Sequence, residues 1–213
     1  MRKSLTRCLL FLSVATGISS CSAYRHMQKI DSDDRCLQQF KPRIQRALYN
    51  TSVDVTGKHI SGLLLIKTMP DSSTRIVFAN EMGFSFFDFG FFGVNGFKVY
   101  QIIPQMDKKG VVKTLRKDFE LVLFRNMSDT HRFALRDSGL VYYGFPQSRG
   151  VNYYVTDTGC SRLVKMQRAS KRKPVMEAFL YSGQSSVPDS IFIRHLNFSF
   201  SITLKKIQAG AKE

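Results

Sequence analysis

The chain has few of the residues on which catalytic and metal-binding sites most often depend. It contains four histidines, and no two of them have the spacing of metal ligands: His26, His59, His131 and His195. The Gly-x-Ser-x-Gly motif of one large class of hydrolases is missing. Asp118 and Glu120 should face apart on a predicted helix, so they do not form a catalytic carboxylate pair. The sequence therefore argues against an enzyme, and it indicates neither a metal site nor a cofactor.

Long hydrophobic runs are also missing. After position 20, no stretch stays apolar for the roughly 18 residues that indicate a transmembrane helix. Tryptophan is absent, whereas there are 18 phenylalanines and 8 tyrosines. The hydrophobic content of 43% is ordinary for a globular protein, and the chain is long enough for one domain with a sizeable core. We expect the part after position 20 to be soluble and to lie outside the bilayer.

The first 21 residues have the composition of an export signal. A basic start with Arg2, Lys3 and Arg7 precedes a short apolar run over 8–15 and small residues up to Ser20. This order is typical of a secretory signal peptide, and the run is too short to span a bilayer, which takes about 20 apolar residues. We therefore predict a signal peptide over 1–20.

The end of this segment, Ile18-Ser19-Ser20-Cys21, resembles a bacterial lipobox. The resemblance implies that Cys21 is acylated on its sulfur, becomes the new N-terminus and ties the protein to a membrane. Each buried methylene group contributes about 0.8 kcal/mol, so two or three acyl chains give lasting attachment. The alternative is an ordinary signal peptide that is cut after Ser20 or Ala23, with Cys21 unmodified.

Acidic residues are scarce relative to basic ones. Without residues 1–20 the chain has 29 basic and 16 acidic side chains, a net charge of +13. Such an excess attracts anions, and beside an envelope membrane these are lipid phosphates and lipopolysaccharide rather than nucleic acid. Basic clusters lie over 108–117 and 162–173, and either could be only a solvated face. From the second cluster we take four candidates for contact with lipid headgroups: Arg168, Lys171, Arg172 and Lys173.

Two cysteines remain once Cys8 leaves with the signal peptide and Cys21 carries lipid. Cys36 and Cys160 form an even pair in an oxidising compartment. A bridge between them would close a long loop and contribute up to about 4 kcal/mol. The sequence gives no distance between the two residues, so free thiols remain the alternative.

After a polar segment over 21–41, interpreted as a lipidated tether, residues 42–213 form one predicted domain with mostly strand chemistry. A helix is expected over 108–124, with Asp107 as its N-cap, because Val111, Leu115, Phe119 and Val122 recur at helical spacing. His195 is expected on the polar face of a strand. Strands are expected over 44–56, 59–69, 74–81, 83–92, 97–103, 140–145, 152–156, 161–167, 175–181 and 196–204.

The segment over 83–93 contains six phenylalanines, which should alternate between the two faces of a strand. The rings either fill a core or line an apolar cavity. Core filling is the simpler interpretation, and nearby glycines add weight to the cavity because they let a sheet bend sharply. The last strand alternates apolar and polar residues, which is typical of a sheet that is covered on one side. We therefore predict a mainly β (α+β) fold, in which a curved antiparallel sheet carries a helix on its concave side.

The lipobox, the strand Ile60-Ser-Gly-Leu-Leu-Leu-Ile-Lys67, the Phe-rich hairpin, the central helix and the alternating last strand together resemble the LolA/LolB superfamily in layout over about 40–207. The resemblance implies an unclosed β-barrel around helices, with an apolar interior that accepts acyl chains. It also implies an outer-membrane lipoprotein that faces the periplasm. The candidate cavity-lining residues are Leu64, Ile66, Val77, Phe84, Phe86, Phe89, Phe198 and Phe200.

Two functions are consistent with these features. The first is a lipid-anchored envelope protein that binds lipid acyl chains or lipidated proteins. The second is an interaction subunit of an outer-membrane assembly, in which the sheet is a scaffold without a ligand cavity. Binding of fatty-acid probes would favour the first, and a solid core with a defined protein partner would favour the second.

Overall fold

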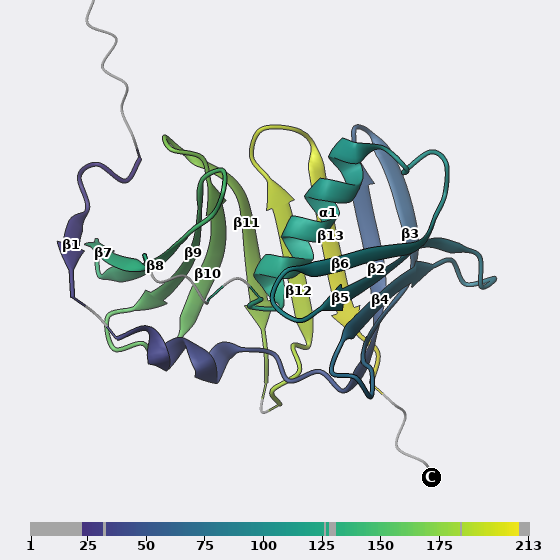
Figure 1. The fold of residues 1–213 in the computed structure, drawn as a ribbon, viewed down its shortest axis with the longest axis horizontal. Coiled ribbons are helices and arrows are strands. Elements are labelled where there is room, and N and C mark those ends of the chain that lie inside the picture. Colours follow the sequence, from purple (N-terminus) through teal and green to yellow (C-terminus); the bar gives the residue numbers. More distant parts are fainter. Residues whose placement is uncertain (1–22, 32, 126, 128–130, 184, 209–213) are drawn as a thin grey trace, which may run out of the picture.

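The computed structural model of the chain describes residues 23–208, apart from 32, 126, 128–130 and 184 (Figure 1). The predicted signal peptide and Cys21 lie outside the described residues. In the described part, no helix has the length and apolar character that crossing a membrane requires.

One antiparallel sheet of 13 strands makes up most of the structure. Two meanders, β2–β6 and β7–β13, are joined where β13 pairs with β2, and β1 pairs with β7. The sheet is unclosed because β1 and β6 are its two end strands. The strands are β1 (Gln28–Ile30), β2 (Arg46–Val55), β3 (Lys58–Thr68), β4 (Thr74–Ala79), β5 (Ser85–Phe92), β6 (Gly96–Ile102), β7 (Phe133–Asp137), β8 (Leu140–Pro146), β9 (Val151–Asp157), β10 (Leu163–Ala169), β11 (Pro174–Tyr181), β12 (Ser190–His195) and β13 (Phe200–Lys206).

The predicted helix is present as α1 (Lys109–Val122), which lies across the concave face of the curved sheet in Figure 1. Leu115, Phe119 and Val122 are buried and pack into the same core as the inward-facing strand residues. The predicted N-cap at Asp107 is wrong. Lys108 occupies the cap position and its side chain makes no capping hydrogen bond. The mainly β fold with a helix on the concave side is confirmed.

Alternation along β5 explains how the sheet fills its own interior. Phe87, Phe89 and Phe91 are at most 3% exposed, and the rings of Phe87 and Phe89 stack with their centroids 4.4 Å apart. Phe119 of α1 closes over them at 6.1 Å from Phe87. Burial of each such ring contributes strongly to the stability of the folded state. The inner face of this strand therefore belongs to a packed core rather than to a cavity wall.

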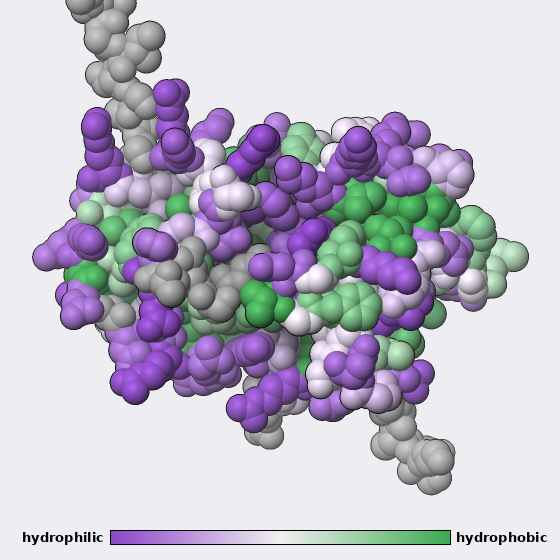
Figure 2. All heavy atoms as spheres, viewed as in Figure 1, coloured by the Kyte–Doolittle hydropathy of each residue, from purple (hydrophilic) through white to green (hydrophobic). Residues whose placement is uncertain are grey.

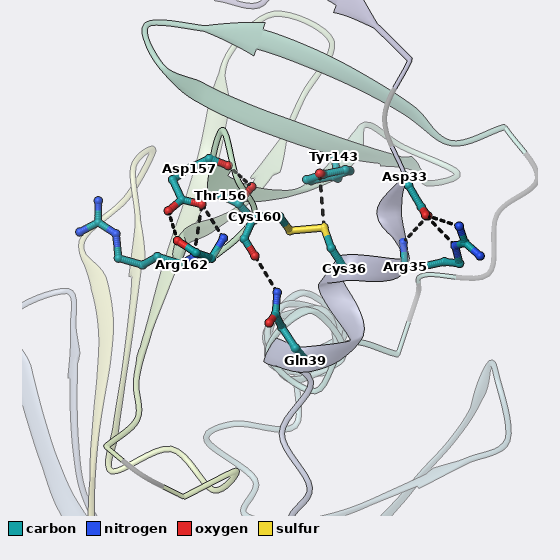
Figure 3. Close-up of a disulfide and its surroundings, with 10 residues drawn as sticks. Asp33, Arg35, Cys36, Gln39, Tyr143, Thr156, Asp157, Cys160 and Arg162 are labelled. Carbon is teal, nitrogen blue, oxygen red and sulfur yellow. Dashed lines mark hydrogen bonds and ion pairs between the residues drawn. A yellow bond between two sulfur atoms is a disulfide. The ribbon is translucent and has the colours of Figure 1, made fainter.

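The segment before residue 42 belongs to the fold, which corrects the predicted tether for its described part. β1 pairs with β7, and a 3-10 helix, η1 (Asp34–Phe40), follows it. A disulfide joins Cys36 of η1 to Cys160 in the β9–β10 turn, 124 residues further on (Figure 3). Next to it, Gln39 Nε2 donates to the carbonyl oxygen of Cys160 at 2.6 Å. The folded unit thus begins before residue 42.

Three strands of the structure were not predicted from the sequence, and the last predicted strand was placed too early in the chain. β1, β7 and β12 were not predicted, whereas the last predicted strand, over 196–204, starts only at Phe200. Leu196 and Phe198 instead lie in the turn before β13 and are 45% and 43% exposed. Ile202 and Leu204 do face the core, so the predicted polarity of the strand holds for its second half.

A candidate binding cleft beside the central helix

A cleft of about 740 Å³ runs along α1, between the helix, β6 and the loop that joins β8 to β9. In Figure 2, hydrophilic side chains gather over the middle of the face where α1 lies, next to a hydrophobic area. Part of the wall is apolar: Phe97 and Val99 come from β6, and Val112 comes from the helix. The volume falls in the range of small-molecule sites, about 300–1,000 Å³.

Helical spacing places the basic side chains along one side of the cleft. Lys109, Lys113, Arg116 and Lys117 lie at positions that share one face of α1, and all four line the cleft. Arg149, from the β8–β9 loop, and Arg168, from β10, complete the basic lining. The lining contains six basic residues and two acidic ones, Asp107 and Glu120, so it carries a net positive charge.

Two of these six cations already have anionic partners. Arg116 Nε donates to Glu120 Oε1 at 2.7 Å, and its guanidinium lies 5.0 Å from the centre of the Phe97 ring. Arg168 Nη1 donates to Asp118 Oδ1 at 2.8 Å. Within the described residues, the other four basic residues have no ion pair of 4 Å or less: Lys109, Lys113, Lys117 and Arg149.

The pKa of Lys117 reflects this crowding of positive charge. Burial of its ammonium group lowers the pKa, and the charges of Arg168, Lys113 and Arg149 lower it further, against a smaller opposing effect of Glu120. A cation whose neighbours are also cations binds an anion more strongly, because the anion relieves the repulsion. Lys117 therefore lies among cations that an anion bound at this place would also meet.

A buried network of side chains holds Arg168, one of the residues that line the cleft. Asp118 is fully buried on α1, and it pairs with Arg168 and also with His195, whose Nε2 lies 2.9 Å from Asp118 Oδ2. The His195 side chain is only 2% exposed and contacts the rings of Phe198 and Phe200. The prediction of His195 as a residue of the polar strand face is wrong, because this histidine turns inward to the helix.

Asn152 adds a polar group with unused bonding capacity. It lies on β9, lines the cleft and is 4% exposed. Its Oδ1 atom is buried and has no hydrogen-bond partner among the described residues. A buried acceptor without a donor costs free energy, so this atom has capacity for a donor that a ligand would bring.

The predicted cavity-lining residues do not line this cleft. Leu64, Ile66 and Phe89 are at most 1% exposed within the packed core. The side chains of Phe84 and Phe198 are instead open to solvent, at 56% and 43% exposure. The remaining three are half-buried: Val77, Phe86 and Phe200. Alternation explains the error at Val77, because its neighbours Ile76 and Phe78 take the inward positions on β4.

Of the predicted headgroup contacts, only Arg168 reaches the cleft. Lys171, Arg172 and Lys173 lie in the exposed turn between β10 and β11 and do not line it. Arg149 and Asn152 are site residues that were not predicted from the sequence. No pattern marks Arg149 in its turn, and Asn152 gains its position from the pairing of β9 with β8 and β10. The basic residues of α1 were visible as a cluster, and helical spacing placed them on one face.

Within the described part of the chain, no group of three or more His, Cys, Asp or Glu side chains is arranged to hold a metal ion.

Comparison with known proteins gives likenesses of fold alone. No family model matches the chain, and no curated protein matches it. A solved DUF1329 family protein from Desulfovibrio piger shares 10% identity, over 84% of this chain and 91% of its own, with a TM-score of 0.48. A solved domain from Vibrio parahaemolyticus, designated a candidate outer membrane lipoprotein-sorting protein, shares 7% identity, over 79% of this chain and 86% of its own, with a TM-score of 0.40.

Proposed function

We propose that the chain is a lipid-anchored protein of the outer membrane, facing the periplasm, that binds lipids or lipidated proteins. The observation that carries the proposal is the cleft of about 740 Å³, with an apolar wall at Phe97, Val99 and Val112 and a basic wall along α1. An amphiphile with a negative headgroup has the matching two-part chemistry. Binding, rather than catalysis, is the role that this arrangement supports.

The proposed compartment draws on independent features. The disulfide between Cys36 and Cys160 fits an oxidising environment outside the cytoplasm. The signal-like start and the lipobox resemblance at Cys21 are the basis for the proposed anchor. We expect Cys21→Ser to move the protein from the membrane to the soluble fraction, as measured by fractionation and immunoblotting. Continued membrane attachment of this variant would contradict acylation at Cys21.

The cleft itself is tested with a soluble amphiphile. We expect the chain with Cys21→Ser to bind a fluorescent lysophospholipid with one molecule per chain, measured by titration below its critical micelle concentration. Val112→Asp places a carboxylate in the apolar wall and should weaken binding about tenfold or more, because an ionised group is costly in such a site. Val94→Asp is the matched control, since Val94 is 56% exposed and does not line the cleft. Equal binding by both variants would contradict the proposal.

The filled core supports a second candidate function. Phe87, Phe89 and Phe91 are buried against the helix, so the interior of the sheet has no open acyl-chain cavity at this point. A scaffold of this kind suits an interaction subunit of an outer-membrane assembly. Co-purification of a defined partner after crosslinking in intact cells, together with no amphiphile binding to the purified protein, would favour this candidate over the first.

A further inference from the structure

Four cations from three different elements meet at one end of the cleft. A second hollow of about 270 Å³ lies beside the first, and the two hollows share four basic residues. The shared basic residues are Lys113 and Lys117 of α1, Arg149 of the β8–β9 loop and Arg168 of β10. Side chains that line both hollows lie at the junction between them. Positive charge is therefore concentrated at one point of the cleft rather than spread over a solvated face.

The packing around this junction fixes one of the four cations in advance. The Arg168 side chain is 12% exposed and is held by Asp118, which His195 holds from its other side. A binding group that is positioned before the ligand arrives loses little conformational entropy when it binds. Lys113, Lys117 and Arg149 have no acidic partner within 4 Å among the described residues, so no carboxylate competes with a ligand for them.

The buried amide of Asn152 gives the site a second chemical requirement. This residue lines the larger hollow together with Arg149 and Arg168, and its Oδ1 atom lacks a donor among the described residues. The dianion of a phosphate monoester, its main form at pH 7, has no proton to give to this atom, whereas a hydroxyl group does. The ligand that satisfies both requirements therefore carries an anionic group and a hydroxyl group close together.

We propose that this junction binds a phosphate ester with a neighbouring hydroxyl group, of the kind found in glycerol phosphate. A phosphate monoester offers up to two negative charges and three acceptor oxygens, and the diester of a phospholipid headgroup offers one charge and two free acceptor oxygens. Either tetrahedral group suits cations that converge from three elements better than a planar carboxylate. The inference deepens the proposed function, on which it rests, because it names the headgroup that the cleft selects. The ester belongs either to a phospholipid headgroup or to a free metabolite.

The first test uses sn-glycerol 3-phosphate and isothermal titration calorimetry on the chain with Cys21→Ser. We expect saturable binding of one molecule, and Arg149→Gln or Lys117→Gln should raise the Kd about tenfold, the effect of one lost charge-assisted hydrogen bond. Arg46→Gln is the matched control, because Arg46 is exposed on β2 and does not line either hollow. Unchanged affinity in both cleft variants would overturn the proposal, as would equal competition by acetate.

A second test isolates the role of Asn152. Asn152→Leu should weaken binding of glycerol 3-phosphate several-fold and leave binding of methyl phosphate, which has no neighbouring hydroxyl group, within twofold. An equal effect on both ligands, in a variant with native circular dichroism, would overturn the hydroxyl requirement. The Arg149 and Lys117 variants test the phosphate contact if Asn152→Leu does not fold.

A third comparison separates this inference from the function on which it rests. Binding of glycerol 3-phosphate with the expected variant pattern, without binding of lysophosphatidylglycerol, supports the phosphate site and a free metabolite, and it contradicts the amphiphile function. Binding of lysophosphatidylglycerol that Arg149→Gln and Lys117→Gln leave unchanged supports the amphiphile function and overturns the phosphate site. Binding of both ligands with the same variant pattern supports a phospholipid headgroup.

Discussion

Asp118 connects α1 to two strands of the sheet. It is fully buried, and it joins the helix to β10 through Arg168 and to β12 through His195. A buried carboxylate that loses its charge leaves its cationic partner unpaired in a poorly solvated place. Removing one partner of such a pair costs about 3–5 kcal/mol, whereas a pair near the surface contributes about 1 kcal/mol or less.

The two kinds of pair therefore predict different losses of stability on mutation. We expect Asp118→Asn to lower the free energy of unfolding by about 3–5 kcal/mol, because Arg168 is then buried without a counter-ion. Asp54→Asn is the control, since Asp54 pairs with His59 at the surface, where the two side chains are 61% and 59% exposed, and it should lose about 1 kcal/mol or less. Urea unfolding followed by circular dichroism measures both values. Similar losses for the two variants would show that Asp118 is not a structural anchor.

Glu177 makes the stability of the folded protein depend on pH. Burial tends to raise its pKa, but hydrogen bonds from Lys165, Arg194 and Gln167, together with the charge of Lys165, outweigh burial and hold the pKa below the ordinary glutamate value. Because the folded state prefers the ionised form, the stabilisation is present above the unfolded pKa and is lost as the pH falls through the folded pKa.

We therefore expect the difference in unfolding free energy between the native chain and Glu177→Gln to be greatest near neutral pH. It should shrink as the pH drops below about 4.3, the ordinary glutamate value. Urea titrations at several pH values measure this difference. A difference that stays constant down to about pH 3 would mean that Glu177 is not ionised preferentially in the folded state.

At the scale of single elements, two glycines near the cleft have opposite roles. Gly150 follows Arg149 with a φ of +94°, and a Cβ atom there would lie 2.0 Å from the carbonyl oxygen of Ala169. Gly110 lies in the first turn of α1, where a Cβ atom would meet nothing within 4 Å. The first position requires glycine, and the second does not.

We expect Gly150→Ala to destabilise the protein by more than about 1 kcal/mol and to weaken ligand binding, because the loop that carries Arg149 must shift. Gly110→Ala should instead stabilise the protein by up to about 1 kcal/mol, the difference in helix propensity. Thermal unfolding and the glycerol 3-phosphate titration check both outcomes. A stabilised Gly150→Ala variant would contradict the strained loop.

The disulfide fastens η1 to the turn between β9 and β10, across 124 residues of sequence. We expect the variant with both Cys36→Ser and Cys160→Ser to lose about 4 kcal/mol of stability, because the unfolded chain gains conformational freedom. The native chain with a reducing agent should match this variant in urea unfolding. A native chain that is insensitive to reductant would show that the bridge does not form in solution.

The parts of the fold that were predicted correctly depend on local sequence patterns. The parts that were missed depend on pairing between segments that are far apart in the sequence. Helical spacing identified α1 within two residues at either end, and alternation gave the polarity of β5 and β13. β1 has only three residues and forms by pairing with β7, and no local sequence pattern predicts it. The cleft could not be predicted from the sequence for the same reason. Arg149, Asn152 and Arg168 come together only through the pairing of β8, β9 and β10.

For the whole molecule, the excess of positive charge acts at two places with different geometry. The turn at 170–173 carries its basic residues on the outside, and the cleft carries its own in a hollow beside the helix. Exposed charges attract an anionic membrane over about 10 Å at 0.1 M salt and recognise no particular group. A hollow with fixed donors selects by shape and by hydrogen bonding. The two places should therefore respond independently to mutation.

We expect a variant with Lys171→Gln, Arg172→Gln and Lys173→Gln to adsorb about a hundredfold more weakly to phosphatidylglycerol vesicles, since each basic residue near such a surface contributes about 1 kcal/mol. Its affinity for glycerol 3-phosphate should stay within twofold of the parent. Arg149→Gln should weaken glycerol 3-phosphate binding about tenfold and reduce vesicle adsorption far less than the triple variant does. Sedimentation with vesicles at low and high salt, alongside calorimetry, measures both quantities. A loss of glycerol 3-phosphate binding in the triple variant that matches its loss of vesicle adsorption would mean that turn and cleft form one continuous surface, because separate sites have no reason to change together.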